Sequence, residues 1–192
     1  MFSISNYLLT MNILAFAGSL RRKSFNKSLL KAAVQQSPEG MNIEIFDLAG
    51  IPLFDADLEA EGDPERVREF KEAIQKSDGL LIASPDYNHG MTAVTKNAID
   101  WASRPAKDKP ISGKPVGILG ASPGRTGTAR SQDQLRISLK AVDAYCMTKP
   151  EFLLSRVHEL INEEGELKDE KNVNFLKTYL NSFANWVNKF KS

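Results

Sequence analysis

The sequence has almost none of the side chains that form disulfides or bind transition metals. Its one cysteine, Cys146, excludes an intrachain disulfide and a cysteine-ligated iron–sulfur cluster. Its two histidines, His89 and His158, lie far apart in the chain, and a zinc site needs more ligands than these provide. No apolar run approaches the roughly 20 residues of a membrane-spanning helix. We therefore expect no metal site and no membrane partner.

An excess of charge of either sign is also missing. The 192 residues include 25 Lys and Arg against 24 Asp and Glu, which gives a formal net charge of +1. Because no net field draws such a chain to nucleic acid, we expect no nucleic-acid partner. Residues 1–10 lack the basic start and long apolar run of a signal peptide. We expect them to be a flexible extension, with Met11 as an alternative start, before a single cytoplasmic domain of residues 11–192.

The chain does contain a regular alternation of short apolar runs and segments with helical periodicity. The apolar runs predict strands at 13–17, 42–46, 79–84 and 116–119, and a fifth within 145–154. The periodic segments predict helices at about 26–36, 64–76, 93–103, 129–142 and 170–190, with a loop over 47–62. This alternation is typical of an α/β, flavodoxin-like three-layer sandwich. Such a fold has a five-stranded parallel sheet in the order 2-1-3-4-5 with helices on both faces.

Several single residues carry structural expectations within these elements. Asp63 is expected to cap the second helix, and Cys146 is expected to lie in the core. Asp100 and Arg104 are four residues apart on one helix, which favours an ion pair between them. An aromatic stripe on the last helix predicts a face packed against the sheet: Phe175, Tyr179, Phe183 and Trp186.

The first strand ends at Gly18, and the loop after it combines hydroxyl, amide and cationic side chains. A helix N-terminus leaves backbone N–H groups unpaired and carries the positive end of the helix dipole. Ser19, Ser24 and Asn26 add neutral donors, and Arg21 adds a forked cation suited to phosphate. The loop therefore predicts a phosphate-monoester site, although a solvated basic loop has the same composition. The glycine patterns of nucleoside triphosphatases and of dinucleotide-binding folds are absent.

Two further loops contain turn-forming polar and aromatic residues. They are Pro85, Asp86, Tyr87, Asn88 and His89 after the third strand, and Ser122 and Gly124 after the fourth. In the order 2-1-3-4-5 the first, third and fourth strands are neighbours, so their carboxyl-end loops meet at one edge of the sheet. A ligand with a phosphate at one end and a planar heterocycle at the other could touch all three. These features describe a mononucleotide.

Three motifs occur in order along the chain. They are 18–26 (Gly-Ser-Leu-Arg-x-x-Ser-x-Asn), 85–104 (Pro-Asp-Tyr-Asn-His, then Lys-Asn-Ala-Ile-Asp-Trp-x-Ser-Arg) and 127–136 (Gly-Thr-Ala-Arg-Ser-Gln-x-x-Leu-Arg). Together they resemble the NADPH-dependent FMN reductase family, the flavodoxin-like reductases of quinones, azo dyes, chromate and free flavin. The resemblance covers about residues 11–154. The segment between the two parts of the second motif departs from the family pattern. This chain has Thr92-Ala93 where the family usually has Pro-Gly, and Thr95 where it usually has Leu.

The resemblance implies a role for each predicted site residue. Ser19, Arg21, Ser24 and Asn26 would bind the FMN phosphate. The isoalloxazine would be bordered by the 85–89 turn, that is Pro85, Asp86, Tyr87, Asn88 and His89, and its pyrimidine end would meet Ser122 and Gly124. FMN carries the chemistry, so no side chain is required as a catalyst, although His89 could supply a proton. The missing Pro-Gly would leave the backbone freer beside the flavin.

The function expected from these features is an FMN-dependent oxidoreductase. It would pass a hydride from NADPH or NADH through FMN N5 to a quinone, an azo compound, a chromate-like oxyanion or free flavin. Arg125 and Arg130 are candidates for the 2′-phosphate of NADPH, and a homodimer or homotetramer is expected. Two alternatives stay open: an FMN-binding electron carrier or redox sensor without reductase activity, and a phosphate-binding domain without flavin.

Overall fold

A parallel sheet forms the centre of the computed structural model, which describes residues 10–191. Every strand pair is parallel, in the order β2-β1-β3-β4-β5, with β6 also paired to β4. The strands are β1 (Met11–Ala17), β2 (Met41–Phe46), β3 (Gly79–Ala83), β4 (Pro115–Ala121), β5 (Tyr145–Cys146) and β6 (Phe152–Leu154). The expected fold class and strand order are confirmed. Residues 1–9 of the expected extension lie outside the described residues, and the single domain of 11–192 stays a prediction.

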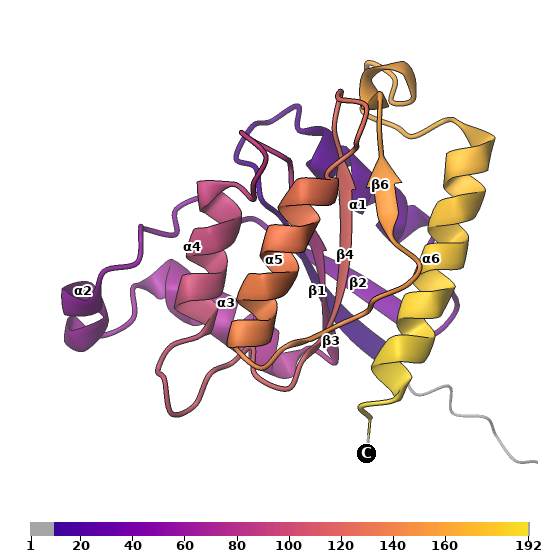
Figure 1. The fold of residues 1–192 in the computed structure, drawn as a ribbon. Coiled ribbons are helices and arrows are strands. Elements are labelled where there is room, and N and C mark those ends of the chain that lie inside the picture. Colours follow the sequence, from indigo (N-terminus) through magenta and orange to yellow (C-terminus); the bar gives the residue numbers. More distant parts are fainter. Residues whose placement is uncertain (1–9, 192) are drawn as a thin grey trace, which may run out of the picture.

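Helices cover both faces of this sheet (Figure 1). They are α1 (Phe25–Gln35), α2 (Ala56–Glu61), α3 (Glu65–Lys76), α4 (Ala93–Ala102), α5 (Ala129–Ala141) and α6 (Glu170–Asn188), with a 3₁₀ turn η1 (Val157–Glu159). One core lies between the sheet and α1 and α6, and the other between the sheet and α3, α4 and α5. All of β3 and β4 is buried, which explains their uncharged sequences. Within residues 10–191, no helix is long and apolar enough to cross a membrane.

The fifth strand position is shared by two short strands. β5 pairs with the amino end of β4 through Pro115 and Val116, and β6 pairs with its carboxyl end. The predicted strand within 145–154 is therefore present but interrupted. The interruption contains Pro150, which has no N–H to donate to a sheet.

The segment 47–62 contains a helix that the sequence analysis missed. The Asp55 side chain caps α2 by accepting from Asp57 N at 2.9 Å. α2 holds Glu59 beside Arg104, whose Nε donates to the carboxylate at 2.9 Å. The expected pair between Arg104 and Asp100 is therefore wrong, and Asp100 instead accepts from Lys96 Nζ at 2.7 Å. A carboxylate on a short helix, 45 residues earlier in the chain, therefore takes the place of the local i,i+4 partner.

Two other expectations for single residues change in the folded chain. Pro64 occupies the N-cap position of α3, so the expected cap by Asp63 is wrong. The Asp63 carboxylate instead accepts from the buried Lys71 Nζ at 2.7 Å. Cys146 is only partly buried, on the α5 side of the sheet, although burial raises the pKa of its thiol to about 11.

The aromatic stripe on α6 packs as expected over its middle and is more open at its ends. Tyr179 and Phe183 are buried, whereas Trp186 is partly buried and Phe175 is exposed. The Tyr179 hydroxyl donates to the carbonyl of Ile118 at 2.7 Å. Burial raises the pKa of the Tyr179 hydroxyl above its ordinary value, although this hydrogen bond lowers it in part. α6 is thus fixed across the middle of β4, on the face opposite α5.

Candidate active site

A cavity of about 270 Å³ opens at the carboxyl edge of the sheet, between the loops that follow β1, β3 and β4. These loops lie together at the top of Figure 1, beyond the tip of β4. The cavity is lined by Ser19, Arg21, Ser24, Phe25, Asn26, Pro85, Asp86, Tyr87, Ala121, Ser122 and Pro123. Three separate segments thus come together as the strand order predicts. Asn88, His89 and Gly124 were predicted to belong to the site but do not line this cavity.

The first loop presents unpaired donors at the start of α1. Ser24 occupies the N-cap position, and its side chain makes no cap hydrogen bond. The first helical bond is from Ser28 N to Ser24 O at 3.0 Å, so the N–H groups of residues 25–27 have no intrahelical acceptor. Arg21 is exposed at the rim, and its Nη2 donates to Lys23 O at 3.2 Å. Hydroxyl, amide and cationic donors therefore converge where the helix dipole is positive.

Asn26 lines the cavity, but its side chain is used inside the protein. Its Nδ2 donates to Ala121 O at 2.9 Å, and its Oδ1 accepts from Ala121 N at 3.0 Å. The side chain is 2% exposed and joins α1 to the end of β4. Only the backbone N–H of Asn26 is left for a phosphate. The amide side chain therefore positions the helix rather than the ligand.

The second loop is a tight turn held by α5. Tyr87 and Gly90 exchange two backbone hydrogen bonds at 3.0 Å, and Asn88 and His89 between them have φ of 53° and 65°. This is a hairpin turn with two left-handed residues. Gln134 of α5 accepts from Met91 N at 2.8 Å, which fixes the far side of the turn.

The outer side of the turn carries a second contact to α5. The guanidinium of Arg130 contacts the His89 ring, and both side chains are exposed. The turn also leaves Tyr87 53% exposed at the mouth of the cavity. An aromatic face therefore lies at the mouth of the cavity, and a cation and an imidazole lie on the outer side of the same turn.

The third loop is anchored by the segment after β6. Ser122 N donates to Leu154 O at 2.9 Å, and Arg156 N donates to Gly124 O at 3.2 Å. The Ser122 hydroxyl accepts from Gly124 N at 3.1 Å. Ser122 therefore faces the cavity while Gly124 shapes the turn behind it. Ala121 and Pro123 also line the cavity, and nothing in their sequence context marks them as site residues.

The departure at Thr92 and Ala93 does not loosen the site, contrary to expectation. Thr92 is the N-cap of α4, and its Oγ1 accepts from Thr95 N at 3.2 Å. The same hydroxyl donates to Gly18 O at 2.7 Å, which ties α4 to the end of β1. Two further buried hydroxyls contact this region, because Ser84 Oγ lies 3.1 Å from both Thr95 Oγ1 and Ser131 Oγ. The sequence analysis predicted no hydrogen bond for any of these hydroxyl side chains. Polar residues at positions expected to be buried were the available signal.

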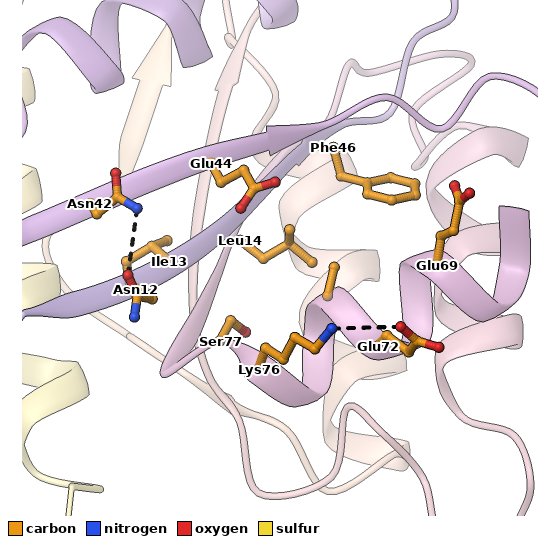
Figure 2. Close-up of a pocket in the computed structure, with 11 residues that line it drawn as sticks. Asn12, Ile13, Leu14, Asn42, Glu44, Phe46, Glu69, Glu72, Lys76 and Ser77 are labelled. Carbon is orange, nitrogen blue, oxygen red and sulfur yellow. Dashed lines mark hydrogen bonds and ion pairs between the residues drawn. The ribbon is translucent and has the colours of Figure 1, made fainter.

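A larger cavity of about 450 Å³ lies elsewhere, between the β2 edge of the sheet and α3 (Figure 2). Its residues come from the amino-terminal half of β1, from β2 and from α3, so it is not at the carboxyl edge. Glu44, Glu69 and Glu72 line it, and of these Glu72 pairs with Lys76 and Glu69 pairs with Arg66. Three carboxylates disfavour the binding of a phosphate, because like charges repel. The smaller cavity is therefore the candidate active site.

The donor set of the smaller cavity fits FMN. The phosphate of FMN carries up to two negative charges. It would suit the free N-terminus of α1, the Ser24 hydroxyl, which makes no cap hydrogen bond, and the Arg21 guanidinium. The Pro85–Tyr87 segment supplies backbone and an aromatic side chain next to the same cavity. Among residues 10–191, no group of three or more His, Cys, Asp or Glu side chains could hold a metal ion.

Comparisons with known proteins agree with this site. Residues 11–159 match the family model described as NADPH-dependent FMN reductase. An NAD(P)H-dependent FMN reductase of Pseudomonas aeruginosa is 43% identical over 181 residues, which cover 94% of this chain and 97% of that protein. A 2-hydroxy-1,4-benzoquinone reductase of Burkholderia sp. is 38% identical over 93% of this chain and 97% of its own.

A solved structure has the same fold over almost its whole length. It is a flavoenzyme NAD(P)H:(acceptor) oxidoreductase from Paracoccus denitrificans, with a TM-score of 0.87 and 32% identity, covering 94% of this chain and 99% of that one. The family model covers most of this chain, including all three loops of the cavity. The chain therefore belongs to the NADPH-dependent FMN reductase family.

Proposed function

We propose that this protein is an FMN-dependent NAD(P)H oxidoreductase whose electron acceptor is a quinone. The observation that carries the proposal is the convergence of Ser19, Arg21 and Ser24 with Pro85 and Tyr87 on one cavity. When bound there, FMN would accept a hydride from NADPH or NADH and pass two electrons to the acceptor. Relatives named as quinone reductases support the choice of acceptor.

The phosphate end of the site would bind through charge and backbone donors. Arg21, the Ser19 and Ser24 hydroxyls and the N–H groups at the start of α1 would hold the phosphate. Asn26 would contribute by fixing α1 against Ala121. Because Ser24 already lies at the N-cap with its hydroxyl uncommitted, little rearrangement is needed for binding.

The ring end of the site would be bordered by the turn 85–89 and by Ser122. The backbone of this turn is rigid, because Tyr87 and Gly90 exchange two backbone hydrogen bonds and Met91 N donates to the Gln134 side chain. Rigid backbone donors stabilise developing charge without reorganising during the reaction. Gly124 would act by holding Ser122, and Asn88 by shaping the turn.

The rim of the cavity would receive the nicotinamide and the quinone in turn. Tyr87 offers an exposed aromatic face for a planar substrate. His89 lies next to Tyr87 in the same turn, with its side chain exposed toward an incoming substrate. Arg130 would place positive charge beside the incoming substrate, and it and Arg125 remain candidates for the 2′-phosphate of NADPH.

An enzyme is favoured over an electron carrier or redox sensor because the similar proteins are named as reductases. We also propose that the chain acts in the cytoplasm, where pyridine nucleotides are available, and as a homodimer or homotetramer. A shallow apolar hollow beside α4 supports association. It is lined by Leu20, Leu48, Ile51, Leu53, Ala93, Val94, Asn97 and Ala98, and Leu53 is 76% exposed.

The visible spectrum of the purified protein, before and after anaerobic NADPH, tests the function. We expect a flavin spectrum that bleaches within seconds of adding NADPH and returns when 1,4-benzoquinone is added. A flavin spectrum that persists with NADPH and NADH would favour the carrier. A protein that contains no flavin and takes up none would overturn the proposal.

A further inference from the structure

Four buried hydroxyl side chains form a connected cluster beneath the loops of the active site. They are Ser84, Thr92, Thr95 and Ser131, each at most 5% exposed. Thr92 Oγ1 lies 2.9 Å from Thr95 Oγ1, Thr95 Oγ1 lies 3.1 Å from Ser84 Oγ, and Ser84 Oγ lies 3.1 Å from Ser131 Oγ. We call these four residues the hydroxyl cluster. It joins the end of β3, the start of α4 and the first turn of α5.

Each end of the hydroxyl cluster terminates on a backbone carbonyl. Thr92 donates to Gly18 O at 2.7 Å, and Ser131 donates to Pro85 O at 2.8 Å. A carbonyl only accepts, so the protons of these two hydroxyls point outward and Thr92 accepts from Thr95. The single Ser84 proton then serves one of three neighbours, which are Thr95 Oγ1, Ser131 Oγ and, at 3.2 Å, Pro85 O. The two carbonyls belong to the loops that follow β1 and β3. The cluster therefore connects the phosphate loop to the ring loop through side chains that never touch the cavity.

The two carbonyls determine where two amide donors point. In a trans peptide the N–H is directed opposite to the C=O of the same unit. The Gly18 carbonyl shares its peptide with the N–H of Ser19, and the Pro85 carbonyl shares its peptide with the N–H of Asp86. Both peptides are trans, so both N–H groups are directed away from the hydroxyl cluster.

The two amide donors belong to residues that line the cavity. Ser19 contributes from the phosphate side and Asp86 from the ring side. Neither N–H donates to another backbone group within residues 10–191. Two oriented donors without backbone acceptors, from two different loops of one cavity, are available to a ligand that accepts from them.

We propose that the hydroxyl cluster is a positioning device for FMN. It orients the Ser19 N–H toward the phosphate and the Asp86 N–H toward the isoalloxazine, and it links these two ends of the site. The proposal rests on the proposed function, because FMN is the ligand.

Binding of FMN and riboflavin to the apoprotein tests the proposal, because riboflavin lacks the phosphate. The variants are Thr92→Val at the phosphate end and Ser131→Ala at the ring end, and dissociation constants come from quenching of flavin fluorescence. We expect Thr92→Val to raise the Kd of FMN about tenfold and to leave that of riboflavin unchanged. We expect Ser131→Ala to raise both by similar factors.

Two further variants separate positioning from general stability. Thr95→Val removes the central hydroxyl and should weaken FMN binding about tenfold, whereas Thr95→Ser keeps the hydroxyl and should restore it. Thr178→Val is the matched control, because the Thr178 hydroxyl also donates to a carbonyl, Asn174 O at 3.1 Å, but on the exposed face of α6. It should leave both dissociation constants unchanged.

The outcomes distinguish this proposal from the proposed function. A wild-type protein that binds no FMN overturns the function and the positioning role together. A wild type that binds FMN, with Thr92→Val and Ser131→Ala folded by circular dichroism and equal to it in affinity, overturns the positioning role alone. Equal losses for FMN and riboflavin in Thr92→Val would also overturn it, because they indicate general destabilisation. If Thr92→Val does not fold, the comparison of Thr95→Val with Thr95→Ser decides the matter: equal FMN affinities for these two variants would overturn the positioning role.

Discussion

Gly18 and Thr95 are so close that a Cβ added to Gly18 would lie 1.8 Å from Thr95 Oγ1. Gly18 follows β1, and Thr95 lies in the first turn of α4, so a contact between backbone and side chain joins two distant elements. The same Cβ would lie 2.9 Å from Thr92 Oγ1. Only glycine permits this approach, and the approach allows the hydroxyl cluster to reach the Gly18 carbonyl.

Gly18→Ala should therefore destabilise the protein by about 1–3 kcal/mol, the usual cost of overpacking a buried site. It should also weaken FMN binding, because the displaced threonines release the Gly18 carbonyl. Urea unfolding of the apoprotein measures the first effect. Gly124→Ala is the control for stability, since its Cβ would meet only Ser122 Oγ, at 3.4 Å. Equal unfolding midpoints for the two variants would contradict the close packing.

Arg21→Ala should weaken FMN binding by roughly 1.5–3 kcal/mol, the size of a hydrogen bond to a charged group. Riboflavin binding should not change, because the side chain would contact only the phosphate. Arg22→Ala provides the control, since Arg22 is an exposed neighbour that does not line the cavity. Fluorescence titration measures all three proteins. An FMN affinity that Arg21→Ala leaves intact would remove Arg21 from the phosphate site.

Asn26→Ala should act first on stability. The variant loses two buried hydrogen bonds to Ala121 and leaves that backbone N–H and carbonyl without side-chain partners. We expect the free energy of unfolding to fall by about 2 kcal/mol or more, because unsatisfied buried groups keep their desolvation cost. If urea unfolding shows no loss while FMN binding collapses, Asn26 is a direct ligand instead.

Cys146 predicts a dependence of stability on alkaline pH. Burial raises the pKa of its thiol from the ordinary 9.0 to about 11, although the nearby Arg136 lowers it in part. The folded state therefore holds the proton more tightly than the unfolded state. The contribution of the protonated thiol to the free energy of unfolding is complete below pH 9 and is lost as the pH rises toward 11.

The difference between wild type and Cys146→Ala isolates this effect from other alkaline titrations. We expect the free energy of unfolding of wild type to decrease more steeply between pH 9 and 11 than that of the variant. Urea unfolding at several pH values measures both slopes. Parallel curves would show that the thiol titrates normally in the folded protein.

Leu53→Glu should reduce self-association. Leu53 is 76% exposed beside the apolar hollow next to α4, and a carboxylate there would have to be desolvated in an interface. Light scattering over a range of concentrations should give an oligomer for wild type and a smaller species for the variant. Ile137→Glu serves as the control, because Ile137 is 71% exposed on α5, away from the hollow. A wild type with the monomer mass at every concentration would exclude the oligomer.

Much of the fold follows from local sequence patterns. Short apolar runs mark β1, β3 and β4, and helical periodicity marks α3 and α6. Both patterns involve only residues two to four positions apart, so they can be read from the local sequence. The α2 helix was missed, because its contact lies elsewhere in the chain. The interruption at Pro150 was also missed, although a proline within a strand segment is a local signal. α2 holds Glu59 against Arg104, 45 residues away, and local spacing favoured Asp100 instead.

The candidate site also has one part that the sequence predicts and another part that depends on distant contacts. From the sequence it follows that the loops after β1, β3 and β4 carry the donors, and that these loops meet at one edge, because parallel strands end on the same side. How each donor is used depends on contacts that form only in the folded chain. Asn26 is committed to Ala121, 95 residues away, and Thr92 reaches Gly18 across 74 residues. A polar side chain bonds whichever group the fold brings within about 3 Å, and no local pattern encodes that distance.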